Sequence, residues 1–347
     1  MKMRILENPP LELWSQVVSQ CDYATFFHTP TWAQIITSSL PKFHLATKGF
    51  VLDDGVIAIV PMVATVERNR YFKWCESMYP GGYGGAVAKR PLTQAEITAI
   101  YEHLLDAGTA HLHIMGNPYT DHDLPASYTR SSQFTHVLPL ARGIDAIVSD
   151  YSAGHKYSIK KAKRLGVRIS VAKTEAEYKS YYEVYIDSLR RWGENALFSY
   201  PYALFEQIYR HRSESVQLWV AKLNDEIVTG SLILYHNDHV DYWHTANRAS
   251  HMDCRAGPLL VTEIIRDACQ KAFRYFDFNP SGGLKGVESY KEGFGAQKVE
   301  FYSYVWQDNR LHYAYKKLLS SMQDALRKVS SLRHLQALPP TPGIASI

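Results

Sequence analysis

The spacing of apolar residues along the chain predicts an α+β protein. Its clearest part is a set of three apolar stretches of strand length, at residues 216–222, 227–235 and 240–246. They are separated by the pairs Asn224-Asp225 and Asn237-Asp238, which are residues common in tight turns. We therefore expect three consecutive strands in the second half of the chain, followed by a helix and further strands.

The rest of the chain mixes helical and strand patterns. Residues 49–63 predict two strands around the turn Asp53-Asp54-Gly55. Thr93, with Glu96 three residues later, forms a capping-box pattern for a helix that opens near Pro91 and runs to about residue 107. Additional helices are expected at 11–20, 31–39, 144–165, 175–192, 201–212, 259–273 and 311–332, and additional strands at 111–115, 135–140, 167–172 and 275–278. A final turn and strand are expected over 293–306.

The length of 347 residues suits about two domains. No long linker interrupts the chain, and both halves run from a hairpin to a helix to a strand, so the first half is a candidate diverged copy of the second. We predict an N-terminal domain at 1–143, a C-terminal domain at 144–335 and a frayed tail at 336–347. Two closely packed domains commonly hold a ligand in the cleft between them.

Composition limits the classes of function. Hydrophobic residues make up 46% and charged residues 21% of the chain, which is typical of a folded protein and argues against extended disorder. The net charge of +4 slightly favours an anionic substrate and does not indicate DNA binding. The 24 Tyr suit either ring-shaped polar ligands or aromatic-rich strands.

Several kinds of site and location are not expected. The four cysteines are too far apart for a zinc site or a disulfide framework, and no third ligand accompanies the strand histidines, so we expect no metal. The N-terminal residues lack the apolar core of a secretory signal, and no stretch approaches the ~20 apolar residues that span a bilayer. A cytoplasmic protein is the expectation.

The segment richest in candidate chemistry begins at the short strand 275–278. Phe276–Pro280 (FDFNP) ends that strand, and Gly282–Leu284 (GGL) forms a loop at its C-terminal edge. Ser289–Gly295 (SYKEGFG) then leads into the last strand. Ligands of open α/β sheets bind at the C-terminal edge of the strands, so this loop region is a candidate site.

This segment resembles the C-terminal signature of the FemABX family of GNAT-fold acyltransferases. Three further segments resemble motifs of the family in the same order: Phe26–Trp32 (FFHTPTW), Tyr79–Gly85 (YPGGYGG) and Lys156–Val167 (KYSIKKAKRLGV). The family includes enzymes that add residues to peptidoglycan precursors from aminoacyl-tRNA. The resemblance implies two packed GNAT-like acyltransferase domains with mixed central sheets and an acceptor bound in the cleft between them.

By this resemblance, Lys291 corresponds to the family lysine proposed to stabilise charge at the reacting carbonyl, and Tyr290 is the aromatic residue beside it. Acyl transfer to an amine passes through a tetrahedral oxyanion, and a fixed cation facing that oxygen contributes roughly 3–4 kcal/mol. The amine must also lose a proton, and the carboxylates nearest in sequence are Asp277, Glu288 and Glu292. Asp277 alternatively holds the following loop in place.

Other candidates concern binding. Lys156, Lys160 and Arg164 share one helical face that suits a pyrophosphate, a nucleotide or an RNA backbone, or that is simply solvated. Lys156 stands where the family often has Arg, so two-pronged phosphate binding is not expected there. Arg255 and Gly257 lie where acetyltransferases of this fold bind the coenzyme A pyrophosphate, although the neighbouring proline removes one N–H donor. The remaining candidate substrate-binding residues are Tyr79, Tyr83 and Trp32.

The sequence thus predicts an N-acyltransferase that moves an acyl or aminoacyl group to an amine of a sugar, a peptidoglycan precursor or a related envelope compound. No tightly bound cofactor is expected, and the donor is either acyl-coenzyme A or aminoacyl-tRNA. No coiled-coil insertion of the kind seen in tRNA-dependent relatives is present, which favours a small acyl donor. Expected partners are a small-molecule or lipid-linked precursor, with charged tRNA and the membrane surface as further candidates. The alternative is a catalytically inactive relative that binds a polysaccharide or a nucleotide-linked ligand.

Overall fold

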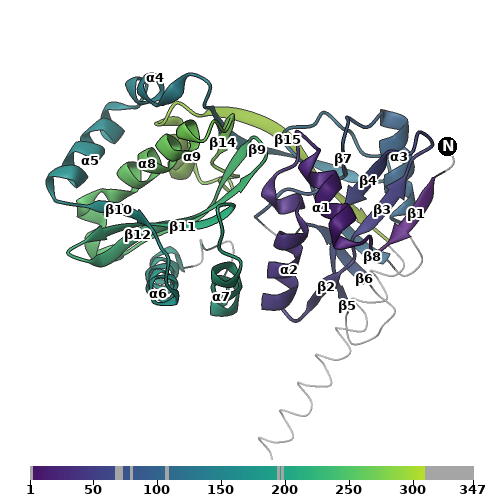
Figure 1. The fold of residues 1–347 in the computed structure, drawn as a ribbon, viewed down its shortest axis with the longest axis horizontal. Helices are drawn as coiled ribbons and strands as arrows, with labels where there is room; N and C mark the ends of the chain where they lie inside the picture. Colours follow the sequence, from purple (N-terminus) through teal and green to yellow (C-terminus); the bar gives the residue numbers. More distant parts are fainter. Residues whose placement is uncertain are drawn as a thin grey trace, which may run out of the picture.

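The computed structural model describes residues 3–66, 73–78, 81–105, 109–193, 196 and 199–308, which form two lobes that share one sheet (Figure 1). The N-terminal lobe consists of β1 (Arg4–Glu7), α1 (Leu11–Ser19), η1 (Phe26–His28), α2 (Pro30–Ser39), β2 (Phe43–Leu45), β3 (Lys48–Val51), β4 (Ile57–Val60), β5 (Val63–Val66), β6 (Lys73–Ser77), β7 (Val87–Ala88), α3 (Gln94–His103) and β8 (Thr109–Met115). The expected α+β class is confirmed.

The C-terminal lobe has its helices on both faces of the sheet, with α5 and α8 on one side and α6 and α7 on the other (Figure 1). Its elements are β9 (Thr129–Pro139), α4 (Gly143–Ser149), α5 (Ala153–Arg164), β10 (Arg168–Val171), α6 (Glu175–Trp192), α7 (Tyr202–Arg210), β11 (Val216–Leu223), β12 (Glu226–His236), β13 (His239–Asn247), η3 (Ala249–Cys254), α8 (Ala256–Gln270), β14 (Tyr275–Asp277), α9 (Lys285–Glu292) and β15 (Gln297–Gln307).

One sheet of eleven strands runs through both lobes in the order β10-β11-β12-β13-β14-β9-β15-β8-β6-β5-β2, and β1-β3-β4-β7 form a second sheet. Within the larger sheet, the pairs β13–β14 and β6–β8 are parallel. In each case a helix connects the two strands, α8 in one lobe and α3 in the other, because parallel neighbours require a crossover. The two lobes therefore repeat one arrangement of hairpin, helix and parallel strand.

Strand β15 joins the lobes and is seen crossing between them in Figure 1. It pairs with β9 through Gln297–Val305 and with β8 through Ser303–Gln307. Strand β9 also pairs with β14, so both of its neighbours come from beyond residue 143 in the sequence. The sheet of the C-terminal lobe is thus completed by a strand from the first half of the chain.

Several local predictions hold because they depend on neighbouring residues. The Thr93 hydroxyl accepts from the Glu96 amide at 3.3 Å and the Glu96 carboxylate accepts from the Thr93 amide at 2.7 Å, so the capping box is confirmed.

The expected single helix over 144–165 is wrong, since Ser152 caps a separate helix, α5, by accepting from the His155 amide at 3.2 Å. The helix expected at 311–332 lies outside the described residues, as does the tail at 336–347.

The lobes share a hydrophobic core in which α2 packs against α7. Trp32 of α2 is fully buried there, with its ring centroid 4.9 Å from that of Trp243 on β13 and 5.4 Å from that of Phe27. Both contacts are edge-to-face, the geometry that aromatic pairs prefer. The shared core and the shared sheet together make the two lobes one packed unit.

Replacing Trp32 with Ala should lower the free energy of unfolding by about 3–5 kcal/mol, because it leaves a cavity between the lobes. Urea unfolding followed by circular dichroism should show one transition, moved as a whole to lower urea. The control is Tyr157→Ala, which truncates an aromatic ring on a residue that is 60% exposed and should change stability by less than about 0.5 kcal/mol. Two wild-type transitions, of which Trp32→Ala moves only one, would contradict a common core.

Candidate functional site

Asp277 ends β14 and is completely buried. Its Oδ2 accepts hydrogen bonds from the hydroxyls of Tyr83 and Tyr119, each at 3.0 Å. Its Oδ1 accepts from the Thr135 hydroxyl at 2.6 Å and from the Asn279 amide at 2.8 Å. Burial raises the pKa of Asp277, and these four donors oppose that shift because they favour the charged form. Since both tyrosines belong to the N-terminal lobe, Asp277 ties the two lobes together.

Asp241 lies opposite Asp277 on the parallel ladder of β13 and β14. It is also fully buried, and neither carboxylate oxygen has a well-formed hydrogen bond with a described residue. Burial and the neighbouring Asp277 raise the pKa of Asp241 well above its usual range, and a backbone contact with Phe26 offsets little of this. Of the two carboxyl groups, Asp241 is the one that favours its protonated form, because Asp277 accepts four hydrogen bonds and Asp241 has none with a described residue.

Lys291 lies on α9, and only 4% of the residue is exposed. Its ammonium donates a hydrogen bond to the backbone carbonyl of Asn279. Burial lowers the pKa of Lys291 to about 8, although the carboxylates of Asp277 and Glu288 oppose the shift. A pKa near this value leaves the side chain mostly charged at neutral pH and within reach of neutralisation in mild alkali.

Three buried polar side chains on β9 and in the loop after β14 have atoms without a hydrogen-bond partner among the described residues. They are both ring nitrogens of His136, the side-chain amide of Asn279 and the hydroxyl of Ser281. Asn279 also has a φ of 56°, so the chain turns sharply as it leaves β14. Because buried polar atoms are nearly always paired, such a group of unpaired atoms beside a buried ammonium is typical of a ligand site.

Tyr290 packs at the edge of the core of the C-terminal lobe. Its ring centroid lies 5.2 Å from that of Phe294 and 5.0 Å from that of His155, and its backbone carbonyl accepts from His155 Nε2 at 2.8 Å. A β-carbon at Gly257 would lie 3.3 Å from the Tyr290 hydroxyl. The structure thus brings together two candidates that the sequence predicted for separate roles.

The candidate coenzyme loop forms the start of α8. Arg255 is exposed and has a left-handed φ of 56° as the residue before the helix, which begins at Ala256. The expected start near residue 259 is therefore too late, and Pro258 lies at the third helical position. The first-turn amides of Ala256 and Gly257 retain the N–H groups that an anion can use at a helix start.

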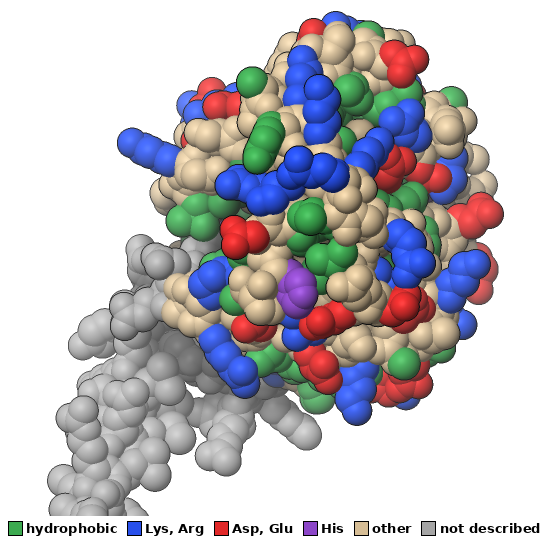
Figure 2. Space-filling model, turned by 90° about the vertical axis from the view of Figure 1, so that its left-hand side faces the viewer, with side chains coloured by type: hydrophobic (Ala, Val, Ile, Leu, Met, Phe, Trp, Pro, Cys, Tyr) green, Lys and Arg blue, Asp and Glu red, His purple; other side chains and the backbone are tan. Residues whose placement is uncertain are grey.

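The basic candidates lie on α5, at the outer edge of the C-terminal lobe. Figure 2 views this side of the molecule and shows Lys and Arg side chains gathered across its upper half. Lys160 and Arg164 are exposed, and no ion pair is found for either within the described ranges. Lys156 donates to the Ser149 carbonyl at 2.7 Å, so its ammonium is partly committed to holding α4 against α5.

The other predicted binding residues have mixed locations. Tyr83 is fully buried and serves Asp277, while Trp32 lies in the shared core. Tyr79 lies outside the described residues. In this geometry Tyr83 forms a hydrogen bond inside the protein, and Trp32 packs in its core.

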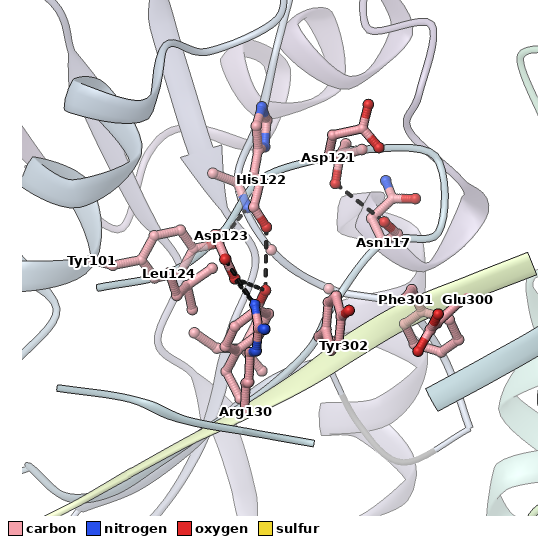
Figure 3. A pocket seen from close by; sticks show the side chains of 17 residues that line it. Tyr101, Asn117, Asp121, His122, Asp123, Leu124, Arg130, Glu300, Phe301 and Tyr302 are labelled. Carbon is pink, nitrogen blue, oxygen red and sulfur yellow. Dashed lines mark hydrogen bonds and ion pairs between the residues drawn. The ribbon is translucent and has the colours of Figure 1, made fainter. Parts of the chain in front are cut away.

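A hollow of about 340 Å³ lies in the N-terminal lobe (Figure 3). The loop 116–124 and strand β15 form much of its wall, and Arg130 projects towards Asp123, with which it pairs at 2.8 Å. The same loop supplies Tyr119 to Asp277, but Lys291 is not among the lining residues. We therefore place the candidate chemistry at Lys291, where the buried charge and the unpaired polar atoms lie.

Two features are absent from the described part of the chain. No cluster of three or more His, Cys, Asp or Glu side chains there is arranged to hold a metal ion. None of the helices in the same ranges combines the length and the apolar character needed to cross a bilayer.

Sequence reasoning missed three residues of this region, namely His136, Asp241 and Tyr119. His136 and Asp241 each interrupt an apolar strand, in the segments FTHVL and HVDYW, and are completely buried. A polar side chain at an inward position of an apolar strand is the signal that could have identified them. Tyr119 follows β8 in a polar loop and carries no comparable signal.

Comparison with known proteins agrees with this description. Residues 149–292 match the family model described as an acetyltransferase (GNAT) domain, and no curated protein matches the chain. The fold is similar to the crystal structure of FemX, with a TM-score of 0.69 and 11% identity over 91% of this chain and 99% of FemX. It is also similar to the C-terminal domain of a putative lysylphosphatidylglycerol synthetase from Agrobacterium fabrum, with a TM-score of 0.55 and 11% identity over 88% of this chain and 94% of that domain.

A conserved protein of unknown function from Bacteroides thetaiotaomicron is similar too, with a TM-score of 0.55 and 8% identity over 88% of this chain and 99% of that protein. At these identities the structural likenesses concern the fold, whereas the family match covers the elements that carry Asp277 and Lys291. Residues 149–292 therefore match a GNAT acetyltransferase domain, and the fold of the chain as a whole is similar to that of FemX.

Proposed function

We propose that the chain is an N-acyltransferase that forms an amide between an activated acyl or aminoacyl group and an amine of an envelope compound. The observation that carries the proposal is the buried ammonium of Lys291 beside unpaired polar atoms at the C-terminal edge of β14. Taking a cation out of water is unfavourable unless something compensates it, so its retention here suggests a chemical role.

In this role Lys291 faces the carbonyl oxygen of the donor. An ammonium has three N–H donors, and one of them is used on the Asn279 carbonyl. The others remain for an oxygen that gains negative charge as the amine attacks the acyl carbon. Because the site is buried, this attraction is stronger than it would be in water.

The two candidate donors share phosphate chemistry, since coenzyme A carries a pyrophosphate and tRNA a phosphate backbone. The exposed cations Lys160 and Arg164 on α5 suit either group, as do the first-turn amides of α8, which follow Arg255 and include that of Gly257. The fold likeness to a domain of a putative lysylphosphatidylglycerol synthetase supports an aminoacyl donor and an envelope acceptor. Donors of both kinds are cytoplasmic, which is where we place the reaction.

Replacing Lys291 with Met should reduce transfer by about 10²–10³-fold, because the oxyanion loses its charged donor. Transfer is measured with labelled acetyl-coenzyme A and labelled aminoacyl-tRNA as donors, and an amino sugar and a lysine-containing peptide as acceptors. The melting temperature should change little, because Met fills a similar volume and removes a buried charge.

The matched control is Lys285→Met, which removes an exposed lysine from the same helix and should leave transfer intact. Full activity of Lys291→Met would refute the proposed role. Tight binding of a sugar or nucleotide ligand by wild-type protein, with no transfer from either donor, would instead support the inactive alternative.

The rate at saturating substrates should fall as the pH rises through about 8, because the Lys291 ammonium loses its proton there. An acceptor whose amine is already neutral at pH 7 keeps its own titration out of the profile. Lys291→Arg retains a charge throughout, so any activity that it has should not fall in this range. A wild-type rate that stays constant to pH 10 would show that the charge of Lys291 is not required.

The double variant Lys160→Glu, Arg164→Glu should raise the KM for the donor roughly tenfold or more and weaken its salt dependence, with kcat almost unchanged, because phosphate contacts are lost. Its control is Lys179→Glu, Arg190→Glu, which reverses two exposed charges on α6. Equal effects of the two double variants would mean that net charge, and not the α5 face, attracts the donor.

A further inference from the structure

We propose that the imidazole of His136 accepts the proton of the attacking amine at the Lys291 site. This inference rests on the proposed amide-forming function. It assigns a residue to the removal of the amine proton, a step for which Lys291 is not suited. It is carried by the position, the burial and the unpaired nitrogens of one histidine on β9.

His136 is held at the site by the sheet. Its backbone carbonyl accepts from the Phe278 amide at 2.9 Å, directly where β14 gives way to the loop of Asn279. On its other side it lies opposite Lys298 of β15. From α9, the carboxylate of Glu292 comes within 3.7 Å of His136 Nε2, and the charge of Lys291 acts on the ring.

The imidazole is fully shielded from solvent, yet neither ring nitrogen has a hydrogen bond with a described residue. The separation of 3.7 Å from Glu292 is too long for one. Since Glu292 is itself 58% exposed, the ring lies just beneath the surface. A neutral imidazole in this place has one nitrogen lone pair that no group in the described ranges uses.

Electrostatics keep the ring neutral. Burial lowers the pKa of His136, and the positive charge of Lys291 lowers it further, whereas Glu292 and Glu288 act in the opposite direction. Lys298, its partner on β15, is another cation on a neighbouring strand. A histidine that is neutral at pH 7 can accept the proton of the amine. The carbonyl oxygen is left to the ammonium of Lys291, which is the charged donor at the site.

The carboxyl groups nearby are less suited to the step. Asp277 already accepts four hydrogen bonds, and Asp241 favours its protonated form. Glu292 is mostly exposed to water, so its carboxylate is not enclosed in the buried site. His136 is the neighbouring group that is both buried and uncommitted.

The step balances as follows. The amine lone pair forms a bond to the acyl carbon, and the carbonyl electron pair moves to the oxygen that faces Lys291. One N–H proton passes to the free nitrogen of His136. When the tetrahedral species collapses, the bond to the thiolate or ribose oxygen breaks, and the imidazolium returns the proton to that leaving group. The products are the amide and the free thiol or hydroxyl.

The test is His136→Gln, measured with the donors used for Lys291 and with an acceptor whose amine stays neutral throughout the acid range scanned. The expected result is a loss of about 10²–10⁴-fold in kcat/KM with donor affinity unchanged. The wild-type rate should also fall as the pH drops below the usual histidine range, because a protonated ring accepts nothing, and this acid limb should vanish in the variant. His113→Gln, a partly buried histidine of β8 in the N-terminal lobe, is the control and should keep both activity and acid limb.

A folded His136→Gln protein with an unchanged rate and acid limb would overturn the inference, while a loss on Lys291→Met would still support the transferase. If neither substitution affects transfer, the proposed function itself fails. Should His136→Gln not fold, NMR titration of the His136 ring in wild-type protein decides the question. A ring pKa equal to that of the acid limb supports the assignment, and a different value overturns it.

Discussion

The charge of Asp277, buried between the lobes, is the constraint on which the rest of the structure depends. Burying a carboxylate costs several kcal/mol unless donors surround it. Here the donors come from separate parts of the chain, with Tyr83 and Tyr119 in the N-terminal lobe and Thr135 on β9. Any slippage of one lobe against the other would leave the charge unpaired, so the lobes have one favourable arrangement.

The same carboxylate fixes the loop that carries the candidate chemistry. It binds the backbone amide of Asn279, and the carbonyl of Asn279 accepts from Lys291. The position of the ammonium is therefore set by a short chain of hydrogen bonds that begins at the boundary between the lobes. Asp241 lies opposite Asp277 in the ladder, and its pKa is raised well above the usual range. It therefore favours the neutral form, which avoids a second buried charge beside Asp277.

The repeated architecture gives the two lobes different tasks. In the C-terminal lobe, the parallel pair β13–β14 leads into the loop and helix of Lys291. In the N-terminal lobe, the equivalent pair β6–β8 is followed by the loop 116–124, whose Tyr119 reaches Asp277. The N-terminal lobe thus supplies a hydrogen bond to Asp277, the carboxylate on which the site in the C-terminal lobe depends.

The sequence by itself determined what depends on neighbouring residues: the hairpin turns, the capping box at Thr93 and the proximity of Lys291 to the end of β14. It also provided the motifs by which the chain resembles a family of acyltransferases. Only the tertiary structure decided that Tyr83 donates to a carboxylate 194 positions away, that His136 lies beside Lys291, and that Trp32 belongs to a core common to both lobes. These contacts follow from which strands pair and which helices pack across the lobe boundary, and no local pattern of residues encodes that choice.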